Sequence, residues 1–291
     1  MAPPPGRLPV PTEIRLEPAG EAWPRLRSSA APQLACQGRL AVDCPLALVV
    51  ALGQERRALE RSLAFARDRR MREFRAEIGA VSGRTVVLMQ AGIGWDRARS
   101  ALLAASRVFP LRAAWSLGFA GGLADGLRPG DLVCPSVVLL DDGRSGEAYN
   151  VAPAHTDIRT TLSAAGLSVH DGPVLTVDAP LRTPQAKRAA HRRTGAVAVD
   201  MEAVGVAHGA RSLGVPWLTI KAVVDAVEEP LPEFLAGCTT PGGDLRWRGV
   251  MWSLVGSGQR RRTLRRLAQS LGQAALALQR ALDAIFAACS P

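Results

Sequence analysis

Two carboxylates, Glu202 and Asp225, stand where acid–base chemistry would be expected. Glu202 lies just beyond a short apolar run, 197–199, and Asp225 ends a longer one, 217–224, with a small-residue helix predicted over 203–213 between them. This pattern is strand–helix–strand, and ligands of open α/β sheets bind at the carboxyl ends of the strands. A buried carboxylic acid at that edge can hold its proton near neutral pH and act as a general acid.

Each of these residues also has a plainer interpretation. Glu202 could be a helix carboxylate that interacts with the dipole, Asp225 could cap the next segment, and Lys221 could be a peripheral strand residue rather than an anion ligand. Two carboxylates at two strand ends of one unit are harder to explain by capping alone. The pair therefore favours a functional site.

Glycines cluster after two other predicted strands. The run 118–122, Gly-Phe-Ala-Gly-Gly, would let the backbone approach a ligand and turn its amide hydrogens toward it, or it could simply make a tight turn. The Gly-Ile-Gly run at 92–94 lacks the third glycine and the ribose-binding acid of a dinucleotide fingerprint. A nicotinamide cofactor is therefore not expected.

The chain is strongly basic, with a net charge of +10, which suits an anionic partner. Arginines are scattered through most segments, and the one dense basic run is 260–266. It opens an amphipathic helix predicted from Gln259, which either packs on the domain or a neighbouring subunit, or lies on a membrane surface. The run lacks interleaved aromatic residues, so nucleic acid is not an expected partner.

Other classes of protein are disfavoured by what the sequence omits. It contains no apolar run long enough to span a bilayer, and its first residues lack the apolar core of a signal peptide. The five cysteines and four histidines show no metal or redox spacing, so we expect free thiols, a cytoplasmic protein and no metal.

Strands alternate with helices along most of the chain, which predicts a three-layer, predominantly parallel α/β domain. Residues 1–43, rich in Pro, Arg and Ala, are expected to be a disordered extension, and 44–291 a single domain ending in the basic amphipathic helix at about 259–288. The main strands are expected in 46–53, 80–91, 113–117, 132–140, 174–177, 197–199 and 217–224.

Four motifs in order, AGIG, GFAGGLADGLRPGDLV, AVDMEA and TIKAVVDA, resemble those of the nucleoside phosphorylases and nucleosidases that include methylthioadenosine/S-adenosylhomocysteine nucleosidase. The resemblance covers about 45–230 and implies a three-layer α/β/α phosphorylase/hydrolase-like fold with a central mixed, mostly parallel sheet. Within this superfamily, the GFAGGL motif and the tail GGDLRWRGVMWSLV with its Arg-rich helix look most like the hopanoid-associated phosphorylases.

The resemblance assigns roles to individual residues. Asp225 matches the aspartate that protonates N7 of the leaving purine, and Glu202 matches the glutamate that binds the ribose 2′- and 3′-hydroxyls. Met201 is implied to pack under the sugar. The remaining implied substrate contacts are Phe119, Ala120, Gly121, Pro180 and Leu181.

The nucleophile is left open between water and phosphate. Nucleosidases of this superfamily carry an early glutamate that activates water; here Arg56 holds the matching position, with Glu55 beside it. An arginine suits phosphate, and Lys221 is a further candidate for the anion or water site. Phe119, where relatives carry a serine of the anion site, and Ser116, where phosphorylases place an arginine, argue against phosphate.

The resemblance therefore implies cleavage of the N-glycosidic bond of a purine nucleoside, with adenine release from the lipid-linked adenosylhopane as the leading expectation. Phosphate is an optional co-substrate and no other cofactor is implied. A homo-oligomer peripheral to the inner membrane is expected. The rivals are a methylthioadenosine/S-adenosylhomocysteine or futalosine-type nucleosidase, and a non-catalytic relative that binds a nucleoside or a membrane.

Overall fold

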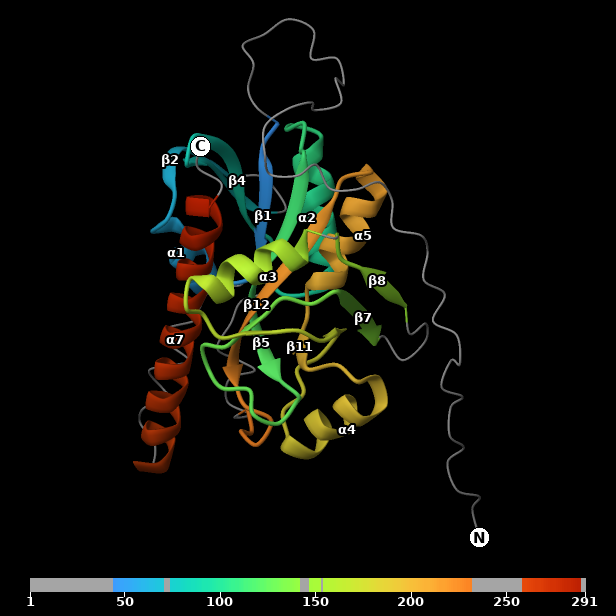
Figure 1. Cartoon of the computed structure of the whole chain (residues 1–291), viewed down its shortest axis with the longest axis vertical. Helices are drawn as coiled ribbons and strands as arrows, with labels where there is room; N and C mark the ends of the chain where they lie inside the picture. Colours follow the sequence, from blue (N-terminus) through green and yellow to red (C-terminus); the bar gives the residue numbers. More distant parts are fainter. Residues whose placement is uncertain (1–43, 71–73, 142–146, 153, 232–257, 289–291) are drawn as a thin grey trace, which may run out of the picture.

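The computed structural model describes residues 44–70, 74–141, 147–152, 154–231 and 258–288 (Figure 1). The extension expected at 1–43 and the tail motif at 242–255 lie outside these residues. No helix of the described residues is long and apolar enough to cross a membrane.

The helices and strands are as follows. The strands are β1 (Leu46–Val50), β2 (Ala64–Arg70), β3 (Arg75–Val81), β4 (Arg84–Gln90), β5 (Ala113–Gly122), β6 (Leu132–Val133), β7 (Val137–Asp141), β8 (Ala148–Asn150), β9 (Val169–His170), β10 (Val174–Val177), β11 (Ala198–Asp200) and β12 (Trp217–Asp225). The helices are α1 (Gly53–Glu60), α2 (Trp95–Ser106), α3 (His155–Ala164), α4 (Pro184–Thr194), α5 (Ala203–Leu213) and α7 (Gly258–Ala288).

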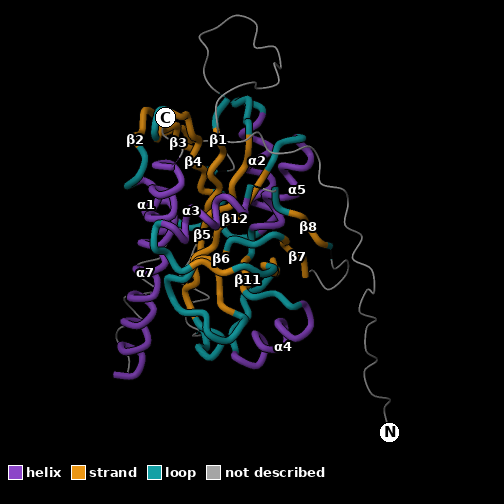
Figure 2. The backbone as a smooth tube through the Cα atoms, in the orientation of Figure 1, coloured by secondary structure: helices purple, strands orange, loops and turns teal. Residues whose placement is uncertain are grey.

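One mixed sheet runs through the molecule in the order β2-β3-β4-β1-β5-β11-β10-β7-β8, and β12 pairs with both β5 and β6 (Figure 2). The pairs of β1 with β4, β1 with β5, and β12 with β5 are parallel, whereas β11 pairs antiparallel with β5. Strand β5 therefore has three neighbours and forms the centre of the sheet. The expected mixed α/β/α fold is confirmed.

Helices cover both faces of the sheet (Figure 1). Helices α2 and α5 pack on each other and on the sheet, and α7 packs on β12, α1 and α3. The close approach of α5 to α2 depends on Gly205, where an added Cβ would lie 1.9 Å from the carbonyl oxygen of Trp95. This contact brings the start of α2 next to the start of α5.

Two local predictions were wrong, and one hairpin was missed. The glycine run 118–122 is not a turn, because β5 continues through it to Gly122. The strand expected over 132–140 is divided into β6 and β7, with Pro135, which lacks the N–H of a ladder bond, in the gap. The antiparallel hairpin of β2 and β3 was not predicted at all.

Helix α7 spans 31 residues and divides into two halves. The C-terminal half is buried in the core through residues such as Leu278, Leu282 and Ile285, and the ring of Phe286 lies 5.9 Å from that of Trp115. In the N-terminal half, Arg262, Arg265 and Arg266 are exposed, while the apolar residues at 264, 267 and 271 are only partly buried.

Candidate active site

Two buried carboxylates from separate elements lie against glycines in the C-terminal half of β5. Glu55 on α1 lies against Gly118, where an added Cβ would meet its Oε1 atom at 2.6 Å. Asp225, at the end of β12, pairs in register with Gly121, where a Cβ would lie 3.4 Å from its Oδ2 atom. Gly118 and Gly121 are three residues apart, about 10 Å along the strand. The glycines make room for the two carboxylates.

Glu55 is held by backbone amides at the start of α1. Its Oε2 atom accepts hydrogen bonds from the N–H groups of Ala51 and Leu52, both at 2.8 Å, and Oε1 accepts one from Phe119 at 2.7 Å. Burial raises the pKa of Glu55, and Lys221 and the three amides oppose that rise. The side chain is therefore a fixed, buried proton acceptor at the edge of the sheet.

Arg56 points away from this group. Its guanidinium donates to Gln90 Oε1 at 3.1 Å and to Glu77 Oε1 at 2.7 Å, and it also contacts Glu60. Successive side chains on a helix leave it in directions about 100° apart, so Glu55 and Arg56 cannot face the same site. Arg56 is bound between α1, β3 and β4.

Lys221 is the cation beside the carboxylates. It is almost fully buried in β12, and its ammonium lies 2.7 Å from Asp200 Oδ2. Asp200 also accepts hydrogen bonds from the Thr176 hydroxyl at 2.6 Å and the Ala203 N–H at 2.9 Å. Burial would lower the pKa of Lys221, but the Asp200 and Glu202 carboxylates outweigh it, so the pKa is raised and the lysine is a stable cation.

Glu202 lies at the N-terminus of α5, where its Oε1 atom accepts a hydrogen bond from the Gly94 N–H at 2.9 Å. Burial raises the pKa of Glu202 to about 8; Lys221 opposes the rise, and the charges of Asp200 and Glu55 add to it. One lysine thus faces three carboxyl groups, and burial, together with the charges of Asp200 and Glu55, raises the pKa of Glu202 so that it retains a proton. A carboxyl that can both donate and accept suits hydroxyl groups.

A pH dependence of stability follows from Glu202. Because its folded-state pKa lies above the ordinary value of 4.5, the protonated form stabilises the fold below that value, and this contribution is lost as the pH rises through about 8. In wild type, the urea midpoint should fall between pH 5 and 8. Glu202→Gln, which imitates the protonated acid, should show a smaller fall. Equal slopes in both proteins would contradict the assignment.

Asp225 is turned into the site by an irregularity in β12. The register with β5 shifts between Val223 and Asp225, so that Asp225 lies opposite Gly121. Lys187 of α4 contacts its carboxylate. Burial raises the pKa of Asp225, Lys187 opposes the rise, and Glu229 adds to it; the pKa is raised overall. A carboxylic acid with a raised pKa can protonate a leaving group.

The expected substrate contacts differ in how far they are buried. Phe119 and Ala120 are buried in β5, and Met201 is partly buried beside Glu202, whose Oε2 atom accepts its N–H at 3.3 Å. Pro180 is exposed and Leu181 partly buried on the loop that joins β10 to α4. That loop is tied to the start of α2 by a hydrogen bond of 2.8 Å from the Trp95 indole to Asp178.

Some site residues were missed by sequence reasoning. Asp200 stands two residues before Glu202 at the same strand end, which was a usable signal, whereas Lys187 lies in a basic helix segment and carries no signal of burial. No group of three or more His, Cys, Asp or Glu side chains in the described ranges is arranged to hold a metal ion.

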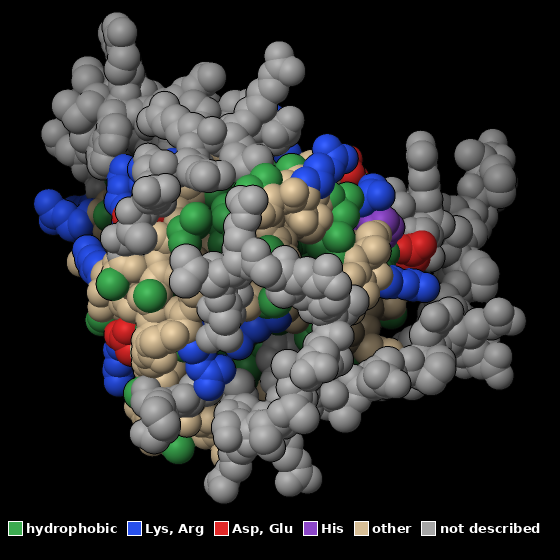
Figure 3. Space-filling model, turned by 90° about the horizontal axis from the view of Figure 1, so that it is seen from above, with side chains coloured by type: hydrophobic (Ala, Val, Ile, Leu, Met, Phe, Trp, Pro, Cys, Tyr) green, Lys and Arg blue, Asp and Glu red, His purple; other side chains and the backbone are tan. Residues whose placement is uncertain are grey.

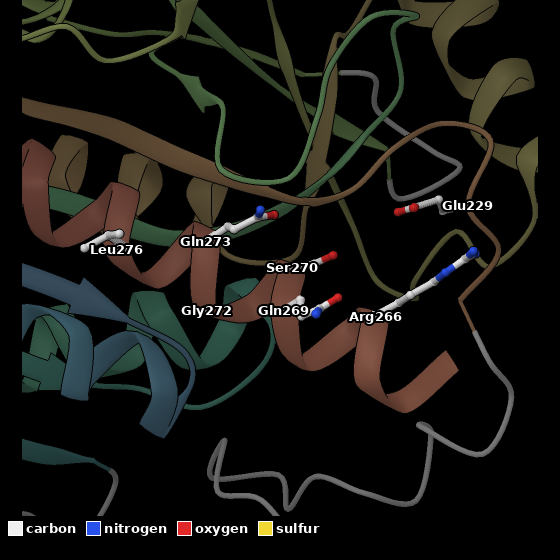
Figure 4. A pocket seen from close by; sticks show the side chains of 7 residues that line it. All are labelled: Glu229, Arg266, Gln269, Ser270, Gly272, Gln273 and Leu276. Carbon is white, nitrogen blue, oxygen red and sulfur yellow. The ribbon is translucent and has the colours of Figure 1, made fainter. Parts of the chain in front are cut away.

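A cavity of about 640 Å³ lies along α7, and none of these carboxylates lines it (Figure 4). Its lining residues are Glu229, Arg266, Gln269, Ser270, Gly272, Gln273 and Leu276. On the face seen in Figure 3, Lys and Arg side chains lie at several separate places rather than in one patch. The carboxylates, rather than this cavity, carry the chemistry of the candidate site.

Comparison with known proteins gives sequence relatives of one kind. The 5′-methylthioadenosine/S-adenosylhomocysteine nucleosidase of Actinobacillus succinogenes is 31% identical over 166 residues, which are 51% of this chain and 71% of that protein. The nucleosidase of the same name from Mycobacterium tuberculosis is 28% identical over 215 residues, 61% of this chain and 84% of that protein.

Solved structures share the fold. The 5′-methylthioadenosine/S-adenosylhomocysteine nucleosidase of Neisseria meningitidis, in complex with methylthio-immucillin-A, has a TM-score of 0.63 at 19% identity and covers 82% of this chain and 99% of its own. Futalosine hydrolase of Helicobacter pylori has a TM-score of 0.65 at 14% identity, covering 83% and 96%.

The family model of the phosphorylase superfamily matches residues 45–239, which include α1, β5, β11 and β12 and so all three carboxylates. This match extends over more than half of the chain and agrees with the order of the four sequence motifs. The expectation of an enzyme of the nucleoside phosphorylase/nucleosidase type is confirmed, and the chain belongs to the phosphorylase superfamily.

Proposed function

We propose that this enzyme hydrolyses the N-glycosidic bond of an adenine nucleoside. The observation that carries the proposal is the placement of Glu55 and Asp225 against glycines of β5, with Glu55 fixed by three amides and Glu202 close enough for its charge to interact with that of Glu55. An oxocarbenium-like sugar needs negative charge beside it, a nucleophile on one side and a protonated leaving base on the other. Three carboxyl groups, of which Glu55 and Asp225 are buried and Glu202 is partly buried, can meet these needs.

The proposed step assigns one role to each carboxyl group. The bond between C1′ and N9 breaks and its electron pair goes to the purine, whose N7 takes the proton of Asp225. A water oxygen bonds to C1′, and its proton passes to Glu55. Glu202 binds the ribose 2′- and 3′-hydroxyls. The products are free adenine and a ribosyl group with a hydroxyl at C1′; no cofactor enters the step.

Water is favoured over phosphate by the charges around the site. Both cations considered for an anion site are already bound: Arg56 by Glu60 and Glu77, and Lys221 by Asp200. A phosphate dianion next to Lys221 would also approach the Glu55 and Asp200 carboxylates, and like charges at short range repel. A neutral water molecule avoids this repulsion.

The proposed substrate is adenosylhopane, with Met201 under the sugar and Phe119, Ala120, Gly121, Pro180 and Leu181 around sugar and base. Support comes from the GFAGGL motif in β5 and from the exposed arginines of α7, which would suit an anionic membrane surface beside a lipid substrate. The rival substrate is a soluble methylthioadenosine or S-adenosylhomocysteine, which the sequence relatives favour, or futalosine, the substrate named for one of the similar solved structures. We also propose a homo-oligomer, as the family resemblance implies.

The test is adenine release, measured from detergent-solubilised adenosylhopane and from each soluble nucleoside, with and without phosphate. Phosphate-independent release from the lipid supports the proposal. A ribosyl phosphate product would make the enzyme a phosphorylase, and release from a soluble nucleoside alone would establish the rival. Binding without release from any of them would indicate a non-catalytic relative.

A further inference from the structure

Lys187 is a fully buried lysine whose function the proposed reaction does not use. It projects from α4, and its ammonium contacts the Asp225 carboxylate. The same ammonium donates to the backbone oxygens of Ala226 at 2.7 Å and Glu229 at 2.9 Å. The three N–H bonds of one side chain are thus all directed at Asp225 and the turn that follows it.

Burying the Lys187 ammonium is energetically costly. Removing an ammonium ion from water costs several kcal/mol, and only a well-placed counter-charge and further hydrogen bonds offset that cost. The next residue of α4, Arg188, shows the ordinary alternative, because it is exposed and lies 3.7 Å from the exposed Glu228. The buried lysine therefore points to a role at Asp225.

The charged groups that face Asp225 come from two elements. Lys187 approaches from α4, and Glu229 from the turn after β12; Arg266 of α7 shares a cavity with Glu229. Lys187 favours the ionised form of Asp225, whereas burial and Glu229 favour the protonated form and keep its pKa raised. Without Lys187, the forces that favour the protonated form would act unopposed.

We propose that Lys187 is the positioning residue of the general acid: it orients the Asp225 carboxyl and sets the upper pH limit of catalysis. The inference rests on the proposed function, since it requires Asp225 to act as the acid. Lys187 ties Asp225 to the backbone of its own turn, so that one carboxylate oxygen is occupied and the other is left for the purine. Lys187 itself touches no reacting atom.

The first test is the pH profile of kcat/KM for adenine release by Lys187→Met. Loss of an adjacent charge shifts a carboxyl pKa by about 1–3 units, so the alkaline limb should move to higher pH by about one unit or more. The looser carboxyl should also lower kcat by about 10–100-fold with little change in KM. Arg188→Met, on the same helix, is the matched control and should leave both unchanged.

An unchanged alkaline limb in folded Lys187→Met would overturn the inference and leave only a structural role. Because the variant buries an unpaired carboxyl group, its folding is checked by a double-mutant cycle in urea at pH 8. Lys187→Met/Asp225→Asn removes both charges and should unfold at higher urea than the sum of the single effects allows. If Lys187→Met alone does not fold, recovery of folding in the double variant supports the pairing, and failure of both overturns it.

The two proposals fail in different ways. Loss of turnover in Asp225→Asn without a shifted limb in Lys187→Met leaves the proposed function in place and removes the role of Lys187. Full turnover in Asp225→Asn would instead remove the general acid, and with it both proposals.

Discussion

Asp225→Asn should lower kcat for adenine release by about 10²–10⁴-fold, the usual contribution of a general acid. The amide has no acidic proton to give to the purine, so the base must leave as an anion. The substitution keeps the shape of the side chain, and its oxygen can still accept from Lys187, which contacts the carboxylate in the native protein. The measurement is single-turnover adenine release by folded protein at several pH values.

The leaving group provides a sharper version of this test. The 4-nitrophenolate group of a 4-nitrophenyl riboside can leave without being protonated. Asp225→Asn should therefore cleave this substrate nearly as fast as wild type does. Asp283→Asn, an exposed position on α7, is the matched control. Unchanged release of adenine by Asp225→Asn, or equal losses on both substrates, would contradict the role of Asp225 as the acid.

The positions of Glu202 and Asp225 could be predicted from the sequence because they depend on local pattern. Two apolar runs of strand type with a small-residue helix between them place both residues at one sheet edge, and the structure has β11, α5 and β12 there. The glycine run was recognised as a place of close approach, although it lies in β5 and is not a turn. In both cases the sequence pattern that supports the prediction extends over only a few neighbouring residues of the chain.

The rest of the site depends on contacts between segments far apart in the chain. Whether Glu55 or Arg56 faces the site is decided by the rotation of α1 against β5, which the adjacent pair of residues does not reveal. Lys187 meets Asp225 across 38 positions, and nothing in the basic segment 187–193 marks it as buried. The β2–β3 hairpin was missed because its charged residues obscure the alternation of a strand.

Glu55→Gln should lower kcat by about 10²–10³-fold, because a neutral amide cannot take the proton of the attacking water. The loss should be similar with and without phosphate, since in the proposed reaction phosphate does not replace water. One amide oxygen must also serve the N–H groups that two carboxylate oxygens share in the native protein, so the urea midpoint should fall slightly. Adenine release under both conditions measures the first effect, and urea unfolding the second.

Two further variants separate water from phosphate. Glu60→Gln, on the same helix, is the control for losing a carboxylate of α1 and should keep most of the activity. Arg56→Met removes one of the two guanidinium groups beside the buried Glu77, since Arg75 also lies 2.8 Å from it, so it should destabilise the fold while the phosphate dependence stays unchanged. Activity that needs phosphate, disappears in Arg56→Met and survives in Glu55→Gln would reverse the assignment: phosphate would then be the nucleophile and Glu55 a structural carboxylate.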